Sequence, residues 1–249
     1  MKIAIVGYGR MGHIIEEVAR GRGHEIVCTI DQGEEEKFSS PEFLGADAAI
    51  EFSVPGAAVG NLKHCIGAKV PVVCGTTGWL QYLPEIADMC LAKGGRLIHA
   101  TNFSIGVNLF WAFNRYMAQV FSKFPEYKPT LSETHHVHKL DHPSGTAITT
   151  AEMTVGADTL LKSWQETDAD VASDVLAVHC ERRGEVPGIH SMMWDSADDF
   201  IKLTHSAKSR RGFAEGAVLS AEWLVKQNPA MYGISDMLAD ITHTAGIFK

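Results

Sequence analysis

The sequence predicts an α/β protein in which an N-terminal doubly wound parallel sheet is followed by a smaller α+β domain. In the first hundred residues, short β-branched runs alternate with helix-like stretches. After Phe103 this alternation gives way to one long apolar helix and several extended segments. A succession of strand, helix and strand requires right-handed crossovers, which produce a parallel sheet covered by helices on both faces.

The N-terminal elements follow one another without a low-complexity linker. Apolar, β-branched runs predict strands at residues 2–6, 25–30, 48–54, 70–74 and 96–101. Helices are expected between them, at residues 10–22, after Pro55 and at residues 80–93.

The C-terminal part has an α+β character and a core of its own. Its expected elements are a helix at 106–121, extended segments at 130–138, 174–183 and 191–207, and a helix from Thr146 to Trp164. The tail, residues 213–227, has the apolar spacing of a helix at Phe213, Val218 and Leu224. We expect this last helix to pack back on the first domain.

Composition excludes several classes of function. The chain has 249 residues and a net charge of -8, which argues against nonspecific binding to nucleic acid or to anionic lipid. It shows no apolar run of membrane length and no leader before the first strand, so a cytoplasmic protein without membrane association is expected. The five cysteines are scattered without a Cys-x-x-Cys pair, which predicts reduced thiols and neither a disulfide framework nor a thiolate zinc site.

A glycine loop, VGYGRMG, joins the first expected strand to the first helix. Gly7 permits the tight turn, Gly9 lets the backbone approach a pyrophosphate, and Gly12 lets the helix lie close to the strand. Asp31, about 20 residues beyond the last glycine, is placed to accept hydrogen bonds from an adenosine ribose. The pattern predicts a dinucleotide site, with a plain connecting turn as the alternative. The residues of the loop expected at the coenzyme are Gly7, Tyr8, Gly9, Arg10, Met11 and Gly12.

The charge near Asp31 bears on the choice of coenzyme. A carboxylate at this position repels a 2'-phosphate, and the neighbouring Gln32 carries no charge to hold one. We therefore expect NADH as the coenzyme, with NADPH as the alternative.

Two further stretches fall at the carboxyl ends of expected strands, where ligands bind in doubly wound sheets. CGTTG at 74–78 and ATNFS at 100–104 offer small residues and backbone amides that can line a nicotinamide. Ordinary strand-end turns are the alternative reading.

The run ETHHVHKLDHPSGTA at 133–147 concentrates groups that handle protons and anions. If 130–138 is a strand, His135 and His136 face opposite sides, whereas His136 and His138 share a face, so a zinc site that also includes His142 stays an alternative. Acid–base chemistry by His135 and Lys139 fits better.

The end of the same run predicts an anion receptor. Ser144 is placed to cap a helix, and the amides of Gly145 and Thr146 then point outward from its N-terminus. Together with Lys139, these groups predict a small polycarboxylate substrate.

This run resembles the signature of the 4-hydroxy-tetrahydrodipicolinate reductase family, the dihydrodipicolinate reductases of the diaminopimelate route to lysine. Other segments resemble the same family in the same order: GRMG at 9–12, CGTTGW at 74–79, NFSIGVN at 102–108, RRGEVPGIHSM at 182–192 and SRRGFAEGA at 209–217.

The resemblance implies two domains and an assembly. Residues 1–103 with 214–249 would bind the dinucleotide, and residues 104–213 would bind the substrate and carry a mixed sheet that builds a homotetramer. The reaction implied is the NAD(P)H-dependent reduction of a small heterocyclic dicarboxylate.

The resemblance also implies roles for particular residues. His135 would be the acid–base residue and Lys139 the proton donor, with the substrate held by His136, Ser144, Gly145 and Thr146. At the coenzyme it places Phe52, Ser53, Gly75, Thr76, Thr77, Ala100, Thr101, Asn102 and Phe103.

The chain departs from the family pattern near the coenzyme. Its glycine loop is one residue shorter than the common form, and Gln32 stands where a basic residue is often found. EFSVP at 51–55 also differs from the usual pattern, which weakens the assignment of Phe52 and Ser53. An aspartate-derived aldehyde dehydrogenase and a non-catalytic nucleotide sensor are the competing functions, and neither explains Lys139 beside the Ser144 turn.

Overall fold

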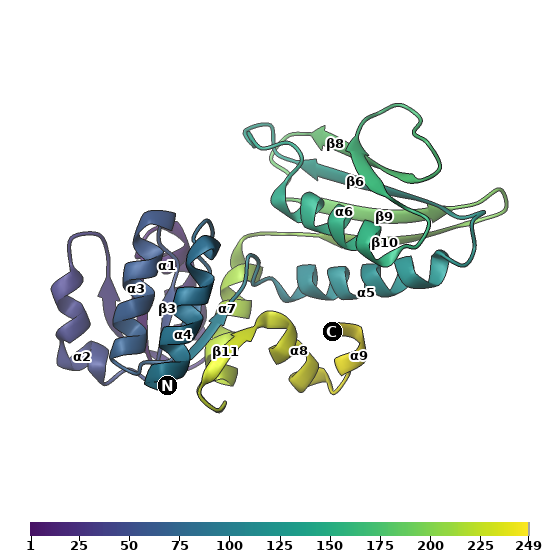
Figure 1. The fold of residues 1–249 in the computed structure, drawn as a ribbon. Coiled ribbons are helices and arrows are strands. Elements are labelled where there is room, and N and C mark those ends of the chain that lie inside the picture. The colour runs from purple at the N-terminus through teal and green to yellow at the C-terminus, as the bar shows by residue number, and fades with distance from the viewer. Residues whose placement is uncertain (249) are drawn as a thin grey trace. The chain divides into compact units, whose positions relative to one another are not determined.

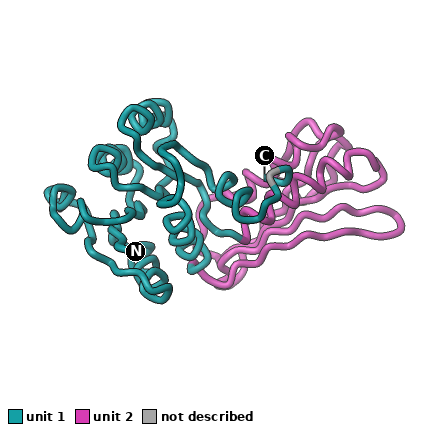
Figure 2. The backbone as a smooth tube through the Cα atoms, turned by 90° about the horizontal axis from the view of Figure 1, so that it is seen from below, with its two compact units in different colours: residues 1–105, 211–249 teal, residues 106–210 magenta. Residues whose placement is uncertain are grey.

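The computed structural model describes residues 1–248, which form two compact units (Figure 2). The first unit comprises Met1–Ile105 and the segment from Arg211 onward, and the second is Gly106–Arg210. No helix in the described part of the chain is long and apolar enough to cross a membrane.

A six-stranded, wholly parallel sheet forms the centre of the first unit (Figure 1). Its strands are β1 (Lys2–Val6), β2 (Glu25–Ile30), β3 (Ala48–Glu51), β4 (Val72–Cys74), β5 (Arg96–His99) and β11 (Ala230–Gly233). They lie in the order β11-β5-β4-β3-β1-β2, so the predicted doubly wound architecture is confirmed.

Helices cover both faces of this sheet. Helices α1 (Arg10–Gly21) and α7 (Arg211–Leu224) lie on one face, and α3 (Pro55–Gly67) and α4 (Leu83–Lys93) lie on the other. The unit also contains α2 (Pro41–Leu44), α8 (Ile234–Thr242), α9 (Ala245–Phe248) and the 3₁₀ turns η1 (Glu35–Ser39) and η2 (Leu80–Tyr82). Along β1, Ile3 and Ile5 join the core under α1 and α7, whereas Ala4 and Val6 join the core under α3 and α4. A strand buried on both faces has no polar alternation, which explains the continuous apolar run IAIV after the exposed Lys2.

The tail confirms one prediction and adds an unexpected strand. Helix α7 packs against α1 and belongs to the first unit, as its apolar spacing predicted. The chain then forms β11, which pairs with β5 at the edge of the sheet. Its sequence, AMYG, is short and lacks β-branched residues, so its pattern carried no strand signal.

The second unit contains a mixed five-stranded sheet with the order β10-β9-β6-β8-β7. Its strands are β6 (Lys128–His135), β7 (Ser163–Glu166), β8 (Val175–Arg182), β9 (Ile189–Asp195) and β10 (Phe200–Ser206). Strand β6 is central, running parallel to β8 and antiparallel to β9. Helices α5 (Ile105–Phe121) and α6 (Gly145–Ala157) pack on one face, where Leu131, Met192 and Trp194 are buried.

The structure corrects two boundaries that bear on the site. The helix predicted from Thr146 to Trp164 ends at Ala157, because the Asp158 side chain turns the chain by accepting the Leu160 amide at 2.8 Å. Residues 163–166 are the strand β7, in which Trp164 pairs with Leu176. The strand expected at 130–138 ends at His135, so the histidines beyond it lie in a loop.

Candidate active site

The carboxyl ends of the parallel strands bring the predicted coenzyme residues together in the first unit. The glycine loop follows β1, and Asp31 follows β2. Phe52 and Ser53 follow β3, CGTTG follows β4, and ATNFS follows β5. Strands β2 and β3 flank β1 on opposite sides, so the chain reverses its direction of winding at this point, where doubly wound sheets bind ligands.

The glycine loop has the close contacts that its sequence predicts. A Cβ on Gly7 would lie 2.2 Å from the Phe52 carbonyl oxygen, and one on Gly12 would lie 2.5 Å from the Gly7 carbonyl oxygen. A Cβ on Gly9 would meet nothing within 4 Å. Helix α1 starts after Gly9 with no side-chain cap and no acidic residue in its first turn. The loop is therefore tight against its own strands and open at the helix N-terminus, which fits a bound pyrophosphate.

The neighbouring strand ends are joined by direct contacts. The Ser53 amide donates to the Thr76 hydroxyl at 2.7 Å, and a Cβ on Gly75 would lie 2.1 Å from the Phe52 ring. The Phe52 and Phe103 rings lie 5.9 Å apart. Thr77 and Thr101 are exposed, and Ala100 is half-buried. These residues line one edge of the sheet, as the resemblance implied.

The surroundings of Asp31 are acidic. Asp31 is exposed at the end of β2, and its carboxylate accepts the Gln32 amide at 3.0 Å. Glu34 lies close enough to accept the Asp31 amide at 3.0 Å. Lys37, the nearby cation, is paired with Glu34 at 2.6 Å and donates to the Thr29 carbonyl.

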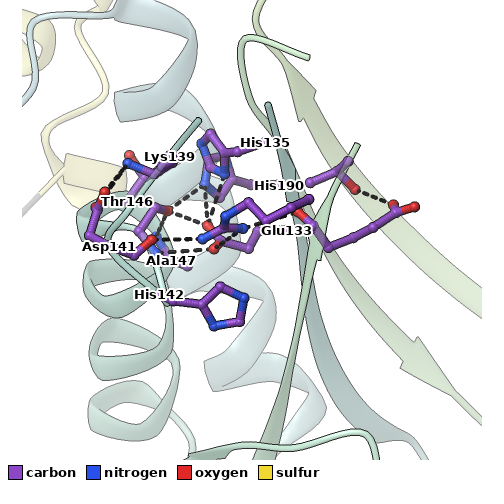
Figure 3. A network of polar contacts seen from close by, with 12 residues as sticks. Glu133, His135, Lys139, Asp141, His142, Thr146, Ala147 and His190 are labelled. Atoms are coloured by element: carbon purple, nitrogen blue, oxygen red, sulfur yellow. Dashed lines mark hydrogen bonds and ion pairs between the residues drawn. The ribbon is translucent and has the colours of Figure 1, made fainter. Parts of the chain in front are cut away.

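A buried carboxylate lies at the centre of the polar cluster in the second unit (Figure 3). Glu133 is 1% exposed, and five donor atoms lie within 3.5 Å of its two oxygens. Oε1 is 3.1 Å from the Ser144 amide and 3.2 Å from Nη1 of Arg182. Oε2 accepts the Ser144 hydroxyl and faces Nδ1 of His135 at 3.3 Å and Nε2 of His190 at 3.5 Å.

These donors decide the ionisation of the cluster. Burial by itself would raise the pKa of Glu133, but the facing His135 and His190 rings and the hydrogen bonds from Ser144 outweigh it and hold that pKa below its ordinary value. Burial lowers the pKa of His190. Glu133 is therefore an anion, and His190 is neutral at neutral pH.

The Ser144 hydroxyl has no hydrogen-bonding capacity left for a substrate. It donates to Glu133, accepts the Ala147 amide at 3.1 Å as the cap of α6, and lies 3.1 Å from Nε2 of His190. The predicted cap is confirmed, and a substrate contact by Ser144 stays a prediction. The amides of Gly145 and Thr146, in the first turn of α6, have no carbonyl partner within the helix.

Lys139 lies in the loop between β6 and α6. Its ammonium donates to both carboxylate oxygens of Asp141 at 2.8 Å, and these hydrogen bonds lower the pKa of Asp141. Arg182 bridges this loop to the buried carboxylate, since its Nη2 donates to the Asp141 carbonyl at 2.7 Å. The loop is thereby tied to the same network as His135.

The remaining histidines do not form the zinc set considered from the sequence. Among the described residues, two groups bring potential metal-binding atoms within 4.8 Å of one another: Glu133, His135 and His190, and His142, Glu166 and Cys180. Neither contains His136 or His138, which lie beyond the end of β6. Burial raises the pKa of the Cys180 thiol, as do the Glu133 and Glu166 carboxylates, so the second group presents a protonated sulfur.

Sequence reasoning missed four residues of this cluster: Glu133, Arg182, Gly188 and His190. Glu133 precedes His135 by two residues on one strand, so the period of two places both side chains on the same face. A glutamate on a buried face is a signal that the sequence offered. Arg182, Gly188 and His190 come from β8, β9 and their connection, and only the sheet pairing brings them to β6.

A nucleotide-type sheet edge in one unit and a cluster of ionisable side chains in the other define a nicotinamide-dependent oxidoreductase. Residues 1–103 match the family model described as "Dihydrodipicolinate reductase, N-terminus", and residues 106–238 match "Dihydrodipicolinate reductase, C-terminus". The chain belongs to the dihydrodipicolinate reductase family.

Individual relatives agree with this assignment. A protein of Christiangramia forsetii named 4-hydroxy-tetrahydrodipicolinate reductase is 42% identical over 241 residues, covering 97% of this chain and 99% of the relative. A protein of the same name from Methanoculleus marisnigri is 32% identical over 255 residues, covering 96% and 99%.

Solved structures share the fold at low identity. Dipicolinate-bound dihydrodipicolinate reductase from Paenisporosarcina sp. TG-14 superimposes with a TM-score of 0.76 at 20% identity, covering 94% of this chain and 97% of that one. An amine dehydrogenase from Mycobacterium smegmatis follows with a TM-score of 0.59 at 12% identity, covering 94% and 95%.

The open position at Gly9 predicts a selective effect on coenzyme binding. Gly9→Ala places a methyl group where no protein atom lies within 4 Å, so the thermal unfolding midpoint should not change. Affinity for reduced coenzyme, measured by fluorescence titration, should fall about tenfold or more because the methyl group occupies the cradle. Gly21→Ala, at the other end of α1 and equally open, is the matched control. Equal affinities for both variants would contradict a pyrophosphate at this loop.

Proposed function

We propose that this protein reduces 4-hydroxy-tetrahydrodipicolinate to tetrahydrodipicolinate with NAD(P)H in the diaminopimelate route to lysine. The observation that carries the proposal is the convergence of His135, Lys139 and the N-terminus of α6 around one turn of the second unit. A dicarboxylate is the ligand that an ammonium group and a helix N-terminus together suit. The names of the relatives, and the dipicolinate held by the Paenisporosarcina enzyme, support the same substrate class.

Each group in the turn has a defined task. Lys139 and the amides of Gly145 and Thr146 bind the two carboxylates of the substrate. His136 is half-buried, lies three residues before Lys139 and contributes a further hydrogen-bond donor. The hydroxyl group of the substrate leaves as water, which creates the unsaturated ring. When bound, the reduced nicotinamide would supply a hydride, two electrons with one hydrogen, to a carbon of that ring. The balancing proton comes from His135 or Lys139, which is left neutral and recovers a proton from water.

Asp141 makes substrate binding an exchange of partners. In the structure the Lys139 ammonium is held by Asp141, which is more than half exposed. A substrate carboxylate takes over one of these hydrogen bonds, so the ammonium is never left without an anion. The exposed position of Asp141 lets water solvate it after the exchange.

For the coenzyme we propose NADH in preference to NADPH. Asp31 and Glu34 make the end of β2 acidic, and Lys37 is already paired, so a 2'-phosphate would meet net negative charge. The residues that hold the coenzyme are those of the glycine loop and of the strand ends described above.

The proposal includes a cytoplasmic homotetramer. Leu131 and Val178 lie on the face of the second sheet that α5 and α6 cover. The alternation along the strands places Thr130, Ser132 and Met193 on the opposite face, outside that hydrophobic core. The edge strand β10 also exposes Phe200 and Ile201. Such a face and edge are suited to pairing between copies of the chain.

The activity is tested by absorbance at the reduced nicotinamide band, with substrate generated from pyruvate and aspartate semialdehyde. His135→Ala and Lys139→Ala should each lower kcat by about 10²-fold to 10⁴-fold while coenzyme affinity persists, because each removes a proton donor. Lys162→Ala is the control, since Lys162 forms an exposed ion pair with Asp174 in the same unit. Full activity in both site variants would show that the chemistry lies elsewhere.

Coenzyme preference is tested by kinetics with the two coenzymes side by side. We expect kcat/KM with NADH to exceed that with NADPH by about tenfold, and Asp31→Asn to reduce this ratio by removing the charge that repels the 2'-phosphate. Glu25→Gln, an exposed acid at the amino end of the same strand, should leave the ratio unchanged. A preference of the wild type for NADPH would refute this part of the proposal.

A further inference from the structure

Glu133 is a buried acid that several segments of the second unit surround. It is almost completely buried, and its carboxylate is surrounded by donors from four separate segments of the second unit. A buried anion is costly unless it is paired and hydrogen-bonded. Glu133 accepts hydrogen bonds from the Ser144 amide, the Ser144 hydroxyl and Arg182, and the His135 and His190 rings face it. The role of the Glu133 carboxylate therefore depends on the function of the donor groups around it.

The first donor is the imidazole of His135. Its Nδ1 faces Oε2 of Glu133 at 3.3 Å, while the His190 ring stands nearly perpendicular to it with centroids 5.0 Å apart. Nδ1 makes no hydrogen bond at this angle, but an ionised carboxylate this close favours a proton on the nitrogen that faces it, so Nδ1 is the protonated nitrogen of His135. This leaves Nε2 as the nitrogen that exchanges a proton with a ligand.

Gly188 keeps that second nitrogen accessible. A Cβ at position 188 would lie 2.9 Å from Nε2 of His135 and 3.3 Å from Cδ2, and the φ of Gly188 is +153°. Any side chain here would cover the exchanging nitrogen or displace the ring. The imidazole therefore faces Glu133 with Nδ1, and the missing side chain at position 188 leaves room beside Nε2.

The second branch of the network runs to the helix N-terminus. Glu133 accepts both the amide and the hydroxyl of Ser144, and Ser144 caps α6 through the Ala147 amide. His190 lies within reach of both Glu133 and Ser144 and is buried with them. The orientation of the first turn of α6 is thus set by the same carboxylate that orients His135.

We infer that Glu133 is a positioning residue: its carboxylate holds His135 with Nδ1 inward and Nε2 free for proton transfer, and through Ser144 it fixes the amides that receive the substrate carboxylate. Glu133 itself is covered by its donors and does not touch the substrate. This inference rests on the proposed function, since it assigns an effect on a reaction that the wild type must first be found to catalyse.

The two branches predict separate kinetic effects. Glu133→Gln keeps the shape of the side chain but removes its charge. In the wild-type background kcat should fall by about tenfold to 10²-fold, which is part of the 10²-fold to 10⁴-fold that a general acid contributes. In a His135→Ala background the same substitution should change kcat by less than about twofold, because the imidazole through which it acts is gone. The accompanying rise in KM should appear in both backgrounds, since the Ser144 branch does not pass through His135.

Comparing Glu133→Gln in the wild-type and His135→Ala backgrounds separates an effect of positioning from general damage to the fold. A loss of kcat by the same factor in both backgrounds, or no loss in the wild-type background, would overturn the inference. If Glu133→Gln does not fold, Glu133→Asp retains the buried charge but retracts it by one methylene, and the same pair of backgrounds applies. Inactivity of the wild type with the proposed substrate would instead refute the proposed function.

A matched control lies on the same helix. Asp158 is also a buried acid, 6% exposed, and ends α6 by accepting the Leu160 amide. Asp158→Asn removes a buried charge at the end of α6 remote from Ser144. Its kcat and KM should match those of the wild type even where its thermal midpoint falls.

Discussion

The geometry of this site depends on a carboxylate removed from water. A buried anion that loses one of its partners costs about 3–5 kcal/mol, so the donors around Glu133 are held as strictly as the carboxylate itself. Because those donors belong to β6, β8, β9 and the start of α6, their separate backbones become one rigid receptor. The loop that carries Lys139 is attached to it through Arg182. Catalysis by positioned groups requires this kind of preorganisation.

The two units solve the problem of ligand binding by opposite means. In the first unit, the predicted site is built from glycines. A Cβ on Gly7, Gly12 or Gly75 would clash with neighbouring atoms, whereas Gly9 leaves open space at the N-terminus of α1. In the second, it consists of polar side chains that converge on one anion. The first arrangement suits a large coenzyme held through its backbone contacts, and the second suits a small, charged substrate.

Sequence reasoning succeeded where structure is local. The run KIAIV is a buried parallel strand because the four residues after Lys2 are apolar, and Ser144 is a helix cap because its neighbours begin a helix. It failed where tertiary pairing overrides local preference. The predicted helix ran into strand β7 because SWQE has a single apolar residue, Trp164, and so shows no alternation; pairing with β8 makes it extended.

The residues of the candidate site also divide into those that local sequence predicts and those that only tertiary pairing reveals. His135 and Lys139 were recognisable from residue type and spacing, and their assignment as acid–base groups stays a prediction. The partners of His135 were not recognisable, because Arg182 and His190 are about fifty residues away in sequence and reach Glu133 only through the register of the second sheet. Glu133 offered one signal, an acid on the strand face that it shares with Leu131 and His135, but that signal does not identify its partners.

The orientation of the His135 imidazole is the central claim, and the position of its proton tests that claim most directly. Long-range ¹H–¹⁵N correlation spectra of histidine-labelled protein, assigned by the signals lost in His135→Ala, report which ring nitrogen is protonated. The account predicts Nδ1 protonated in the wild type and a changed pattern in Glu133→Gln. A neutral His135 ring protonated only at Nε2 in the wild type would contradict it.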